Sequence, residues 1–421
     1  MKKRIGLLLL VVLAPWLVTP ATAVEFFDIN SPSIKKAELD ISATQTSTQN
    51  ATAVSTLKDM LDRSLLFDVV DGKSGFSLTI DGTVESGQAI FTLSDNTAGS
   101  EFKPIAFGVR FSSQDPDYLR RKTAQVGNKL LRDLFGLRGA LGSTIVWATQ
   151  DPGESVKSLR IGVFGMGEHK QLTYNLFSNA GVSWNPGRDG IVYTSHTDRG
   201  TQVMVQQTNP LRAKSISIFE NEGRSSAAFW APDGTMFVSQ FISNSNTDIY
   251  QYAVEGNPFE DGRLKQLKRI TSDRNVETEP SVSSDGRRLA YISDRTGQPQ
   301  VYVMDLSTNK AERVSKVGGY NASPTWSPDG RYLAYFGIRS GQSSIYRLDM
   351  QSGQERRVTP QTLKAEQPRW SPDGSLIVFT GEERGTKKIY YTLSSGGGVR
   401  RLTNSAAGVE ESDAAWGPAQ K

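Results

Sequence analysis

The chain has 421 residues and no cysteine, which excludes disulfides, thiol catalysis, thiolate metal sites and a lipid-anchored cysteine. Its formal charge is +4, and three of these charges belong to Lys2, Lys3 and Arg4, in a segment that we expect to be removed. The mature chain then carries about +1 (4 − 3), which gives no basis for a nucleic-acid-binding face. The length fits two domains, and the composition is that of an ordinary globular protein.

Residues 1–23 have the pattern of an export signal. A charged start is followed by an apolar run over residues 5–13, and Ala21-Thr22-Ala23 is a small-residue cleavage site. Pro15 interrupts the run, which is shorter than the roughly 20 residues that span a bilayer. We therefore predict cleavage after Ala23 and a periplasmic protein that does not span the membrane. An uncleaved membrane anchor is the alternative.

Residues 24–142 are predicted to form a small α/β domain preceded by an extended arm. A strand over residues 37–41 precedes a helix that Asn50 is expected to cap. Three segments then alternate like paired strands, at residues 76–80, 88–93 and 105–111. A second helix is expected to begin at Asp115-Pro116 and to end at Gly136.

From residue 143 onwards, a short phrase of the type W-x-P-D-G recurs six times. The gaps between successive copies are 46, 52, 44, 44 and 46 residues, and the copies begin at Trp184, Trp230, Val282, Trp326, Trp370 and Trp416. Short β-rich runs separated by turn residues fill the gaps. A period in the forties with this filling is typical of a β-propeller. The tryptophans are expected to pack between blades, and each Asp to bond its own turn.

The two ends of the repeat region are expected to complete one blade together. Residues 143–173 supply three strands without an inner strand, and residues 413–416 supply an inner strand without outer ones. Sharing a blade in this way removes open sheet edges. We therefore predict an all-β, closed six-bladed propeller over residues 143–421.

No catalytic or metal-binding pattern stands out. The two histidines, His169 and His196, fall in different blades without ligand spacing, and no nucleophile elbow or phosphate-binding loop is present. The glycines of residues 162–167 lack a following helix. Glu277, Glu279 and Glu366 could line a channel, but no acid–base pair is singled out. The chain is therefore predicted to be non-enzymatic, with no metal and no cofactor.

The segments before the inner strands are the best binding candidates. Because every Pro-Asp-Gly turn follows an inner strand, the segments that precede these strands lie on the opposite face, around the channel mouth. They are polar and cover residues 222–226, 275–279, 319–323, 364–367 and 409–413. Loops on a rigid scaffold are common binding sites, and an ordinary solvated rim is the alternative.

The whole layout resembles the TolB family of the Tol–Pal cell-envelope system. An export signal, an α/β domain and six W-x-P-D-G blades closed by Ala414-Ala415-Trp416-Gly417-Pro418 occur in the family's order. Three local strings also resemble family strings, at residues 134–140, 278–280 and 302–306.

This resemblance implies a periplasmic adaptor that supports outer-membrane integrity and envelope constriction at division. It implies that the peptidoglycan-associated lipoprotein Pal binds at the channel mouth, with other outer-membrane lipoproteins or porins as further possible partners. Thr278 and Glu279 match family contact positions, Arg224 falls near a family histidine and Ala227 matches a small family residue. The full set of expected Pal-binding residues is Arg224, Ser226, Ala227, Thr278, Glu279, Asn321, Ser323, Glu366 and Glu411.

The family's N-terminal segment pairs with TolA by strand addition. In this chain the corresponding arm is residues 24–31, and the expected TolA-binding residues are Glu25, Phe26, Phe27, Asp28 and Ile29. The arm suggests a switch in which capture by TolA changes the Pal-binding face. Two alternatives stay open: a hydrolase that uses the channel, and a glycan-binding module in which Tyr320 stacks on a sugar ring.

Overall fold

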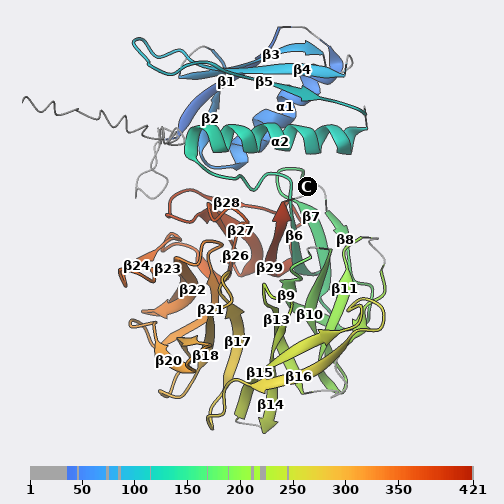
Figure 1. Ribbon diagram of the computed structural model, residues 1–421, viewed down its shortest axis with the longest axis vertical. Helices are drawn as coiled ribbons and strands as arrows, with labels where there is room; N and C mark the ends of the chain where they lie inside the picture. The colour runs from blue at the N-terminus through green and yellow to red at the C-terminus, as the bar shows by residue number, and fades with distance from the viewer. Residues whose placement is uncertain are drawn as a thin grey trace, which may run out of the picture.

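The computed structural model places a small α/β region against one end of a β-propeller (Figure 1). It describes residues 36–419 except 45–46, 73–74, 84–86, 114, 168, 188, 210–212, 219–223 and 244–245. The predicted export signal and the TolA-binding arm lie outside the described residues. Within the described part, no helix is both long enough and apolar enough to cross a bilayer.

The α/β region is a five-stranded mixed sheet with two helices, α1 (Thr48–Arg63) and α2 (Pro116–Phe135). Both helices lie on the side of the sheet that faces the propeller (Figure 1). The sheet has the order β2-β1-β3-β4-β5, with β1 at Ala37–Ala43, β2 at Phe67–Val70, β3 at Phe76–Thr83, β4 at Gln88–Asp95 and β5 at Ile105–Arg110. The short strand β2, which pairs in parallel with β1, was not expected from the sequence.

One helix cap is confirmed and the other is corrected. The Asp115 side chain accepts the Tyr118 N–H at 2.8 Å at the start of α2, and Gly136 ends the helix with a left-handed φ of 69°. Helix α1 is capped by Ser47 rather than Asn50. Asn50 lies inside the helix, where its buried amide donates to the Gly82 carbonyl at 3.0 Å and so ties α1 to β3.

The propeller has six four-stranded antiparallel blades among the described residues, which confirms the predicted architecture. We number the blades along the chain by their inner strands. Blade 1 is β9 (Ser178–Trp184), β10 (Gly190–Thr197), β11 (Gly200–Gln207) and β12 (Ile216–Ser217), and blade 2 is β13 (Ser225–Trp230), β14 (Met236–Ser243), β15 (Asn246–Glu255) and β16 (Arg263–Arg269). Blade 3 is β17 (Glu277–Val282), β18 (Arg288–Ser293), β19 (Gln300–Asp305) and β20 (Lys310–Arg313).

The remaining three blades include the closure of the ring. Blade 4 is β21 (Tyr320–Trp326), β22 (Tyr332–Arg339), β23 (Gln342–Asp349) and β24 (Glu355–Arg357), and blade 5 is β25 (Lys364–Trp370), β26 (Leu376–Glu383), β27 (Thr386–Leu393) and β28 (Val399–Arg401). Blade 6 joins the two ends of the repeat region as β29 (Glu410–Ala419), β6 (Ser143–Gln150), β7 (Ser158–Val163) and β8 (His169–Gln171). Strand β29 pairs antiparallel with β6, as the sequence predicted.

Three of the repeated tryptophans, Trp184, Trp326 and Trp370, join neighbouring blades. The Trp326 indole donates to the Ser281 carbonyl of the preceding blade at 3.1 Å, and the Trp370 indole donates to the Thr325 carbonyl at the same distance. Both rings are buried. A buried carbonyl that loses its donor is costly, so these bonds favour one blade-to-blade register.

The α/β region is attached to the end of the ring where the Pro-Asp-Gly turns lie. The Arg400 guanidinium, on β28, forms a bidentate pair with the Asp62 carboxylate of α1 at 2.6 and 2.9 Å. Beside this pair, the Phe164 ring packs edge-on against Tyr391 and Trp416, within a hydrophobic core that continues into the α/β region. The end of the ring where the inner strands begin lies on the far side, away from the described α/β elements (Figure 1).

We predict that Trp370→Phe lowers the free energy of unfolding by about 1–2 kcal/mol more than Trp147→Phe does. Both indoles are buried, but the Trp147 Nε1 has no hydrogen-bond partner, whereas Trp370 Nε1 bonds the next blade. Chemical denaturation of the two variants measures the difference. Equal losses would show that the inter-blade bond contributes nothing beyond ring packing.

We also predict that the stabilising effect of Asp62 depends on pH. The hydrogen bond from Arg400 lowers the pKa of Asp62 in the folded chain, so its contribution is present above the unfolded pKa of about 4. That contribution is lost as the pH falls through the lower folded pKa. Asp62→Asn should therefore reduce the thermal midpoint at pH 7, and the gap to the wild type should narrow on acidification. A gap independent of pH would contradict this.

Candidate functional site

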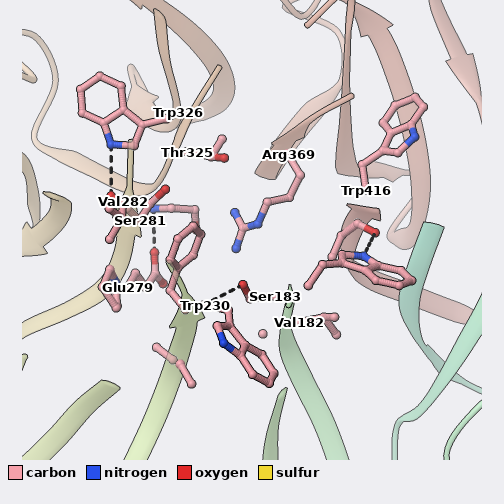
Figure 2. A pocket seen from close by; sticks show the side chains of 18 of the residues that line it. Val182, Ser183, Trp230, Glu279, Ser281, Val282, Thr325, Trp326, Arg369 and Trp416 are labelled. Atoms are coloured by element: carbon pink, nitrogen blue, oxygen red, sulfur yellow. Dashed lines mark hydrogen bonds between the residues drawn. The ribbon is translucent and has the colours of Figure 1, made fainter. Parts of the chain in front are cut away.

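The inner strands of all six blades enclose an axial cavity of about 790 Å³. Its lining runs from the mouth, where the inner strands begin, to the tryptophans and prolines of the repeated turns. Figure 2 shows part of this lining, with Arg369 extending into the open space between Glu279 and Trp416.

Each inner strand carries one residue in the left-handed backbone region, and these six residues all line the cavity. Each lies at a register shift between the inner strand and its neighbour, where the strand bulges. We call this set the bulge ring: Gly181, Ala227, Glu279, Ser323, Gln367 and Asp413, with φ between 47° and 63°. Five of the six are not glycine, so the ring stores backbone strain, a feature that clusters at functional sites.

Side chains of the bulge ring bond the next blade. The Glu279 carboxylate accepts the Ser323 N–H at 2.7 Å. The Gln367 side chain accepts the Asp413 N–H at 3.2 Å and donates to the Asp413 carboxylate at 2.6 Å. The side chains of Glu279, Gln367 and Asp413 therefore link neighbouring blades and also line the cavity.

The Arg369 guanidinium lines the same cavity as the carboxylates of Glu279 and Asp413. Burial raises the pKa of Glu279, the Arg369 guanidinium opposes that rise, and Asp413 adds to it. Burial lowers the pKa of Arg369, while Glu279 and Asp413 favour its charged form. Among the described residues, Arg369 makes no direct ion pair, and its one hydrogen bond runs from Nη1 to the Pro368 carbonyl at 2.8 Å.

The structure brings five of the nine expected Pal-binding residues to the cavity wall: Ser226, Ala227, Thr278, Glu279 and Ser323. Arg224 is exposed at the mouth, immediately before β13. Glu366 lies at the edge of the mouth, where its carboxylate pairs with Lys387 at 3.1 Å. Six of these seven residues are at least partly accessible on one face, and Ser323 is buried in the cavity wall, with 6% of its surface exposed.

The other two expected residues, Asn321 and Glu411, require a correction because they are buried, with 0% and 1% of their surface exposed. Asn321 donates to the Gln300 side chain at 2.8 Å and to the Val317 carbonyl at 3.0 Å. Glu411, on β29, accepts the hydroxyl of Thr403, which lies in the segment between blades 5 and 6. Both support the segments behind the mouth and offer no surface to a partner.

Among the residues that line the cavity, Gln367, Arg369 and Asp413 were not in the expected Pal-binding set, although Gln367 and Asp413 fall in the predicted rim segments. Arg369 immediately precedes the repeated tryptophan of blade 5. A comparison of that position across the repeats would have found it, because the equivalent residues are Ser183, Phe229, Ser281, Thr325 and Ala415. Arg369 is the one charged residue of the six.

The histidines and remaining acids give no further site. His196 is exposed and lines the cavity, whereas His169 lies on β8, next to Arg160 and Trp147. Glu277 is buried beside Ser293 and Arg295 rather than lining the channel. In the described part of the chain, no group of three or more His, Asp or Glu side chains is placed to hold a metal ion.

Comparisons with known proteins point to one family. The family model described as the TolB beta propeller domain matches residues 132–420. A TolB homolog from Chlorobium luteolum is 29% identical over 195 residues, which are 46% of this chain and 42% of that protein. The Tol-Pal system protein TolB of Bordetella pertussis is 29% identical over 207 residues, which are 48% of this chain and 44% of that protein. These matches therefore span less than half of either relative.

A solved structure agrees with the fold. The crystal structure of TolB from Acinetobacter baumannii superposes with a TM-score of 0.76 over 91% of this chain and 97% of that one, at 20% sequence identity. At that identity the likeness concerns the fold alone.

We predict that Glu279 stabilises the mouth as a hydrogen-bond acceptor. Glu279→Gln retains an oxygen for the Ser323 N–H and should leave the free energy of unfolding nearly unchanged. Glu279→Ala leaves that N–H without its partner and should cost about 1–2 kcal/mol. Chemical denaturation of both variants compares them, and equal losses would contradict the bonding role.

Proposed function

The chain belongs to the TolB family, and from that premise we propose that it is a non-enzymatic periplasmic adaptor of the Tol–Pal system. In this proposal, the channel mouth binds the lipoprotein Pal, and the N-terminal arm binds TolA. The adaptor thereby supports outer-membrane integrity and constriction at division. Other outer-membrane lipoproteins or porins are further candidate partners.

The observation that carries the proposal is the character of the mouth face. The described α/β region covers the opposite end of the ring and leaves this face accessible. Large apolar side chains stand exposed around the mouth: Leu176, Phe241, Ile242, Val317 and Ile338. Exposed apolar groups gathered beside a polar cavity are typical of a protein-docking surface.

The residues proposed to contact Pal are seven of the expected set, of which six are partly accessible at the mouth and one, Ser323, lies in the cavity wall. Thr278 and Glu279 belong to blade 3, where Thr278 bonds blade 2 and Glu279 bonds blade 4, and Arg224, Ser226 and Ala227 belong to blade 2. Ser323 and Glu366 continue the surface onto blades 4 and 5. Thr278 already donates to Ser239 at 3.2 Å, so it is positioned before any partner binds.

Export to the periplasm follows from the proposed signal over residues 1–23, with cleavage after Ala23. The proposed domains are residues 24–142 and 143–421. In this scheme the arm at residues 24–31 adds a strand to TolA, as the family resemblance implies.

The glycan-binding alternative loses its main support. It depended on a stacking surface at Tyr320, but this ring is only partly exposed and packs against Phe336 with 5.8 Å between centroids. A protein that docks at the mouth can cover the exposed apolar side chains there, which a sugar ring stacked on Tyr320 alone would not reach.

We predict that Phe241→Asp and Val317→Asp each weaken binding of the purified soluble domain of the source organism's own Pal at least about fivefold, because each places a charge in the docking surface. Calorimetric titration of the full mature chain measures the affinity. Ile90→Asp, which changes an equally exposed apolar residue on β4 of the α/β region, should leave it unchanged. No binding by the wild type, or equal losses in all three variants, would contradict the proposal.

A further inference from the structure

We propose that Arg369 makes the axial cavity a carboxylate-binding site, filled by an acidic side chain of the partner that docks at the mouth. The identity of the partner rests on the proposed function. The chemistry of the site rests on Arg369 and its surroundings alone.

The repeats of this chain show that ring construction does not require a charge at this position. The five equivalent residues are serine, phenylalanine, serine, threonine and alanine, and their blades have the same four-stranded form. An arginine inside the cavity costs desolvation, which also lowers its pKa. The packing of the ring therefore does not explain why an arginine occupies position 369.

The guanidinium of Arg369 retains unused donors. It has five N–H groups, and only the bond from Nη1 to the Pro368 carbonyl is formed within the described residues. The nearby acids form no bond with the others in the described structure, and their own printed partners lie elsewhere. Glu279 bonds Ser323, and Asp413 accepts from Gln367 and from Ser412.

A carboxylate is the ligand that fits this arrangement. The planar guanidinium fork pairs with a carboxylate through two parallel N–H···O bonds, which a hydroxyl or a single carbonyl cannot match. Ser281 and Thr325 lie at the same level of the wall and line the cavity on the side of blades 3 and 4. Their hydroxyls can donate to a carboxylate oxygen that is already held by Arg369.

The charge of the bulge ring restricts which anion enters. Glu279 and Asp413 repel a free anion, and this repulsion falls when Glu279 is protonated, a form that its burial favours. A side chain delivered by a docked partner enters against this repulsion because the docking contacts hold it in place. The cavity of about 790 Å³ has ample room for one acidic side chain.

The first test is calorimetric titration of the mature full-length chain with the same soluble Pal domain. Arg369→Gln should weaken binding about 30-fold or more, as expected when one member of a desolvated charge pair is removed. Arg331→Gln is the matched control, because Arg331 is an exposed arginine beside a Pro-Asp-Gly turn at the opposite end of the ring. Unchanged affinity in Arg369→Gln, with binding by the wild type intact, would overturn the inference.

A double-mutant cycle then identifies the acid. Each acidic residue of the Pal domain is changed to its amide and titrated against both the wild type and Arg369→Gln. One amide variant should weaken binding to the wild type and have no further effect on Arg369→Gln. Strict additivity for every acidic residue would overturn the inference even if Arg369→Gln alone binds weakly.

A second measurement separates this inference from the proposed function. The Arg369 Nε–H signal is followed in Glu279→Gln, which removes one of the two charges that repel a free anion, and is assigned in nitrogen-15 spectra by its loss in the Glu279→Gln/Arg369→Gln double variant. It should shift on addition of sodium acetate but not of sodium chloride at equal ionic strength. If the wild type binds no Pal domain and the signal still shifts, the proposed function fails and the carboxylate site stands. If acetate causes no specific shift, the carboxylate site is wrong whichever partner binds.

Discussion

The left-handed residue in each inner strand is the constraint on which the rest of the site depends. The bulge at that point interrupts the pairing with the second strand, and the left-handed residue of each of the six inner strands lines the cavity. Neighbouring blades then bond through the same residues, as Glu279 does with Ser323 and Gln367 with Asp413. Further along the channel, the indoles of Trp184, Trp326 and Trp370 also bond the preceding blade. The shape of the cavity is therefore set by the ring itself, and its chemistry is set by the few side chains that differ between repeats.

Much of the architecture could be predicted because its signals are local and repeated. The six copies of the W-x-P-D-G phrase gave the blade count, and the unmatched strands at the two ends gave the closure through β29 and β6. The start of α1 was misplaced because Ser47 and Asn50 are both good capping residues, and only the buried bond from Asn50 to Gly82 decides between them. The accessibility of Asn321 and Glu411 was also misjudged. Buried and exposed side chains do not simply alternate along a strand near a bulge. The bulges themselves could not be located, because residues such as Ala227 and Ser323 carry no sequence signal for a positive φ.

The two ends of the ring have different roles in this account. The end with the Pro-Asp-Gly turns is bound to the α/β region through Asp62, Arg400 and a shared hydrophobic core. The other end combines exposed apolar side chains with a polar cavity. A rigid scaffold that separates an attached domain from an open docking face suits an adaptor. In the same account, Arg369 gives this chain a means of selecting among partners, because a docked protein without an acid at the right place would cover the half-buried guanidinium and leave it unpaired.

The most direct measurement is hydrogen–deuterium exchange of the mature chain with and without the soluble Pal domain. If the mouth is the docking surface, protection should concentrate in residues 224–228, 275–281 and 317–323, which surround the channel entrance. The Pro-Asp-Gly turns and the α/β region should exchange as they do in the free chain. Protection confined to the turns or to the α/β region, with the mouth unchanged, would contradict the account.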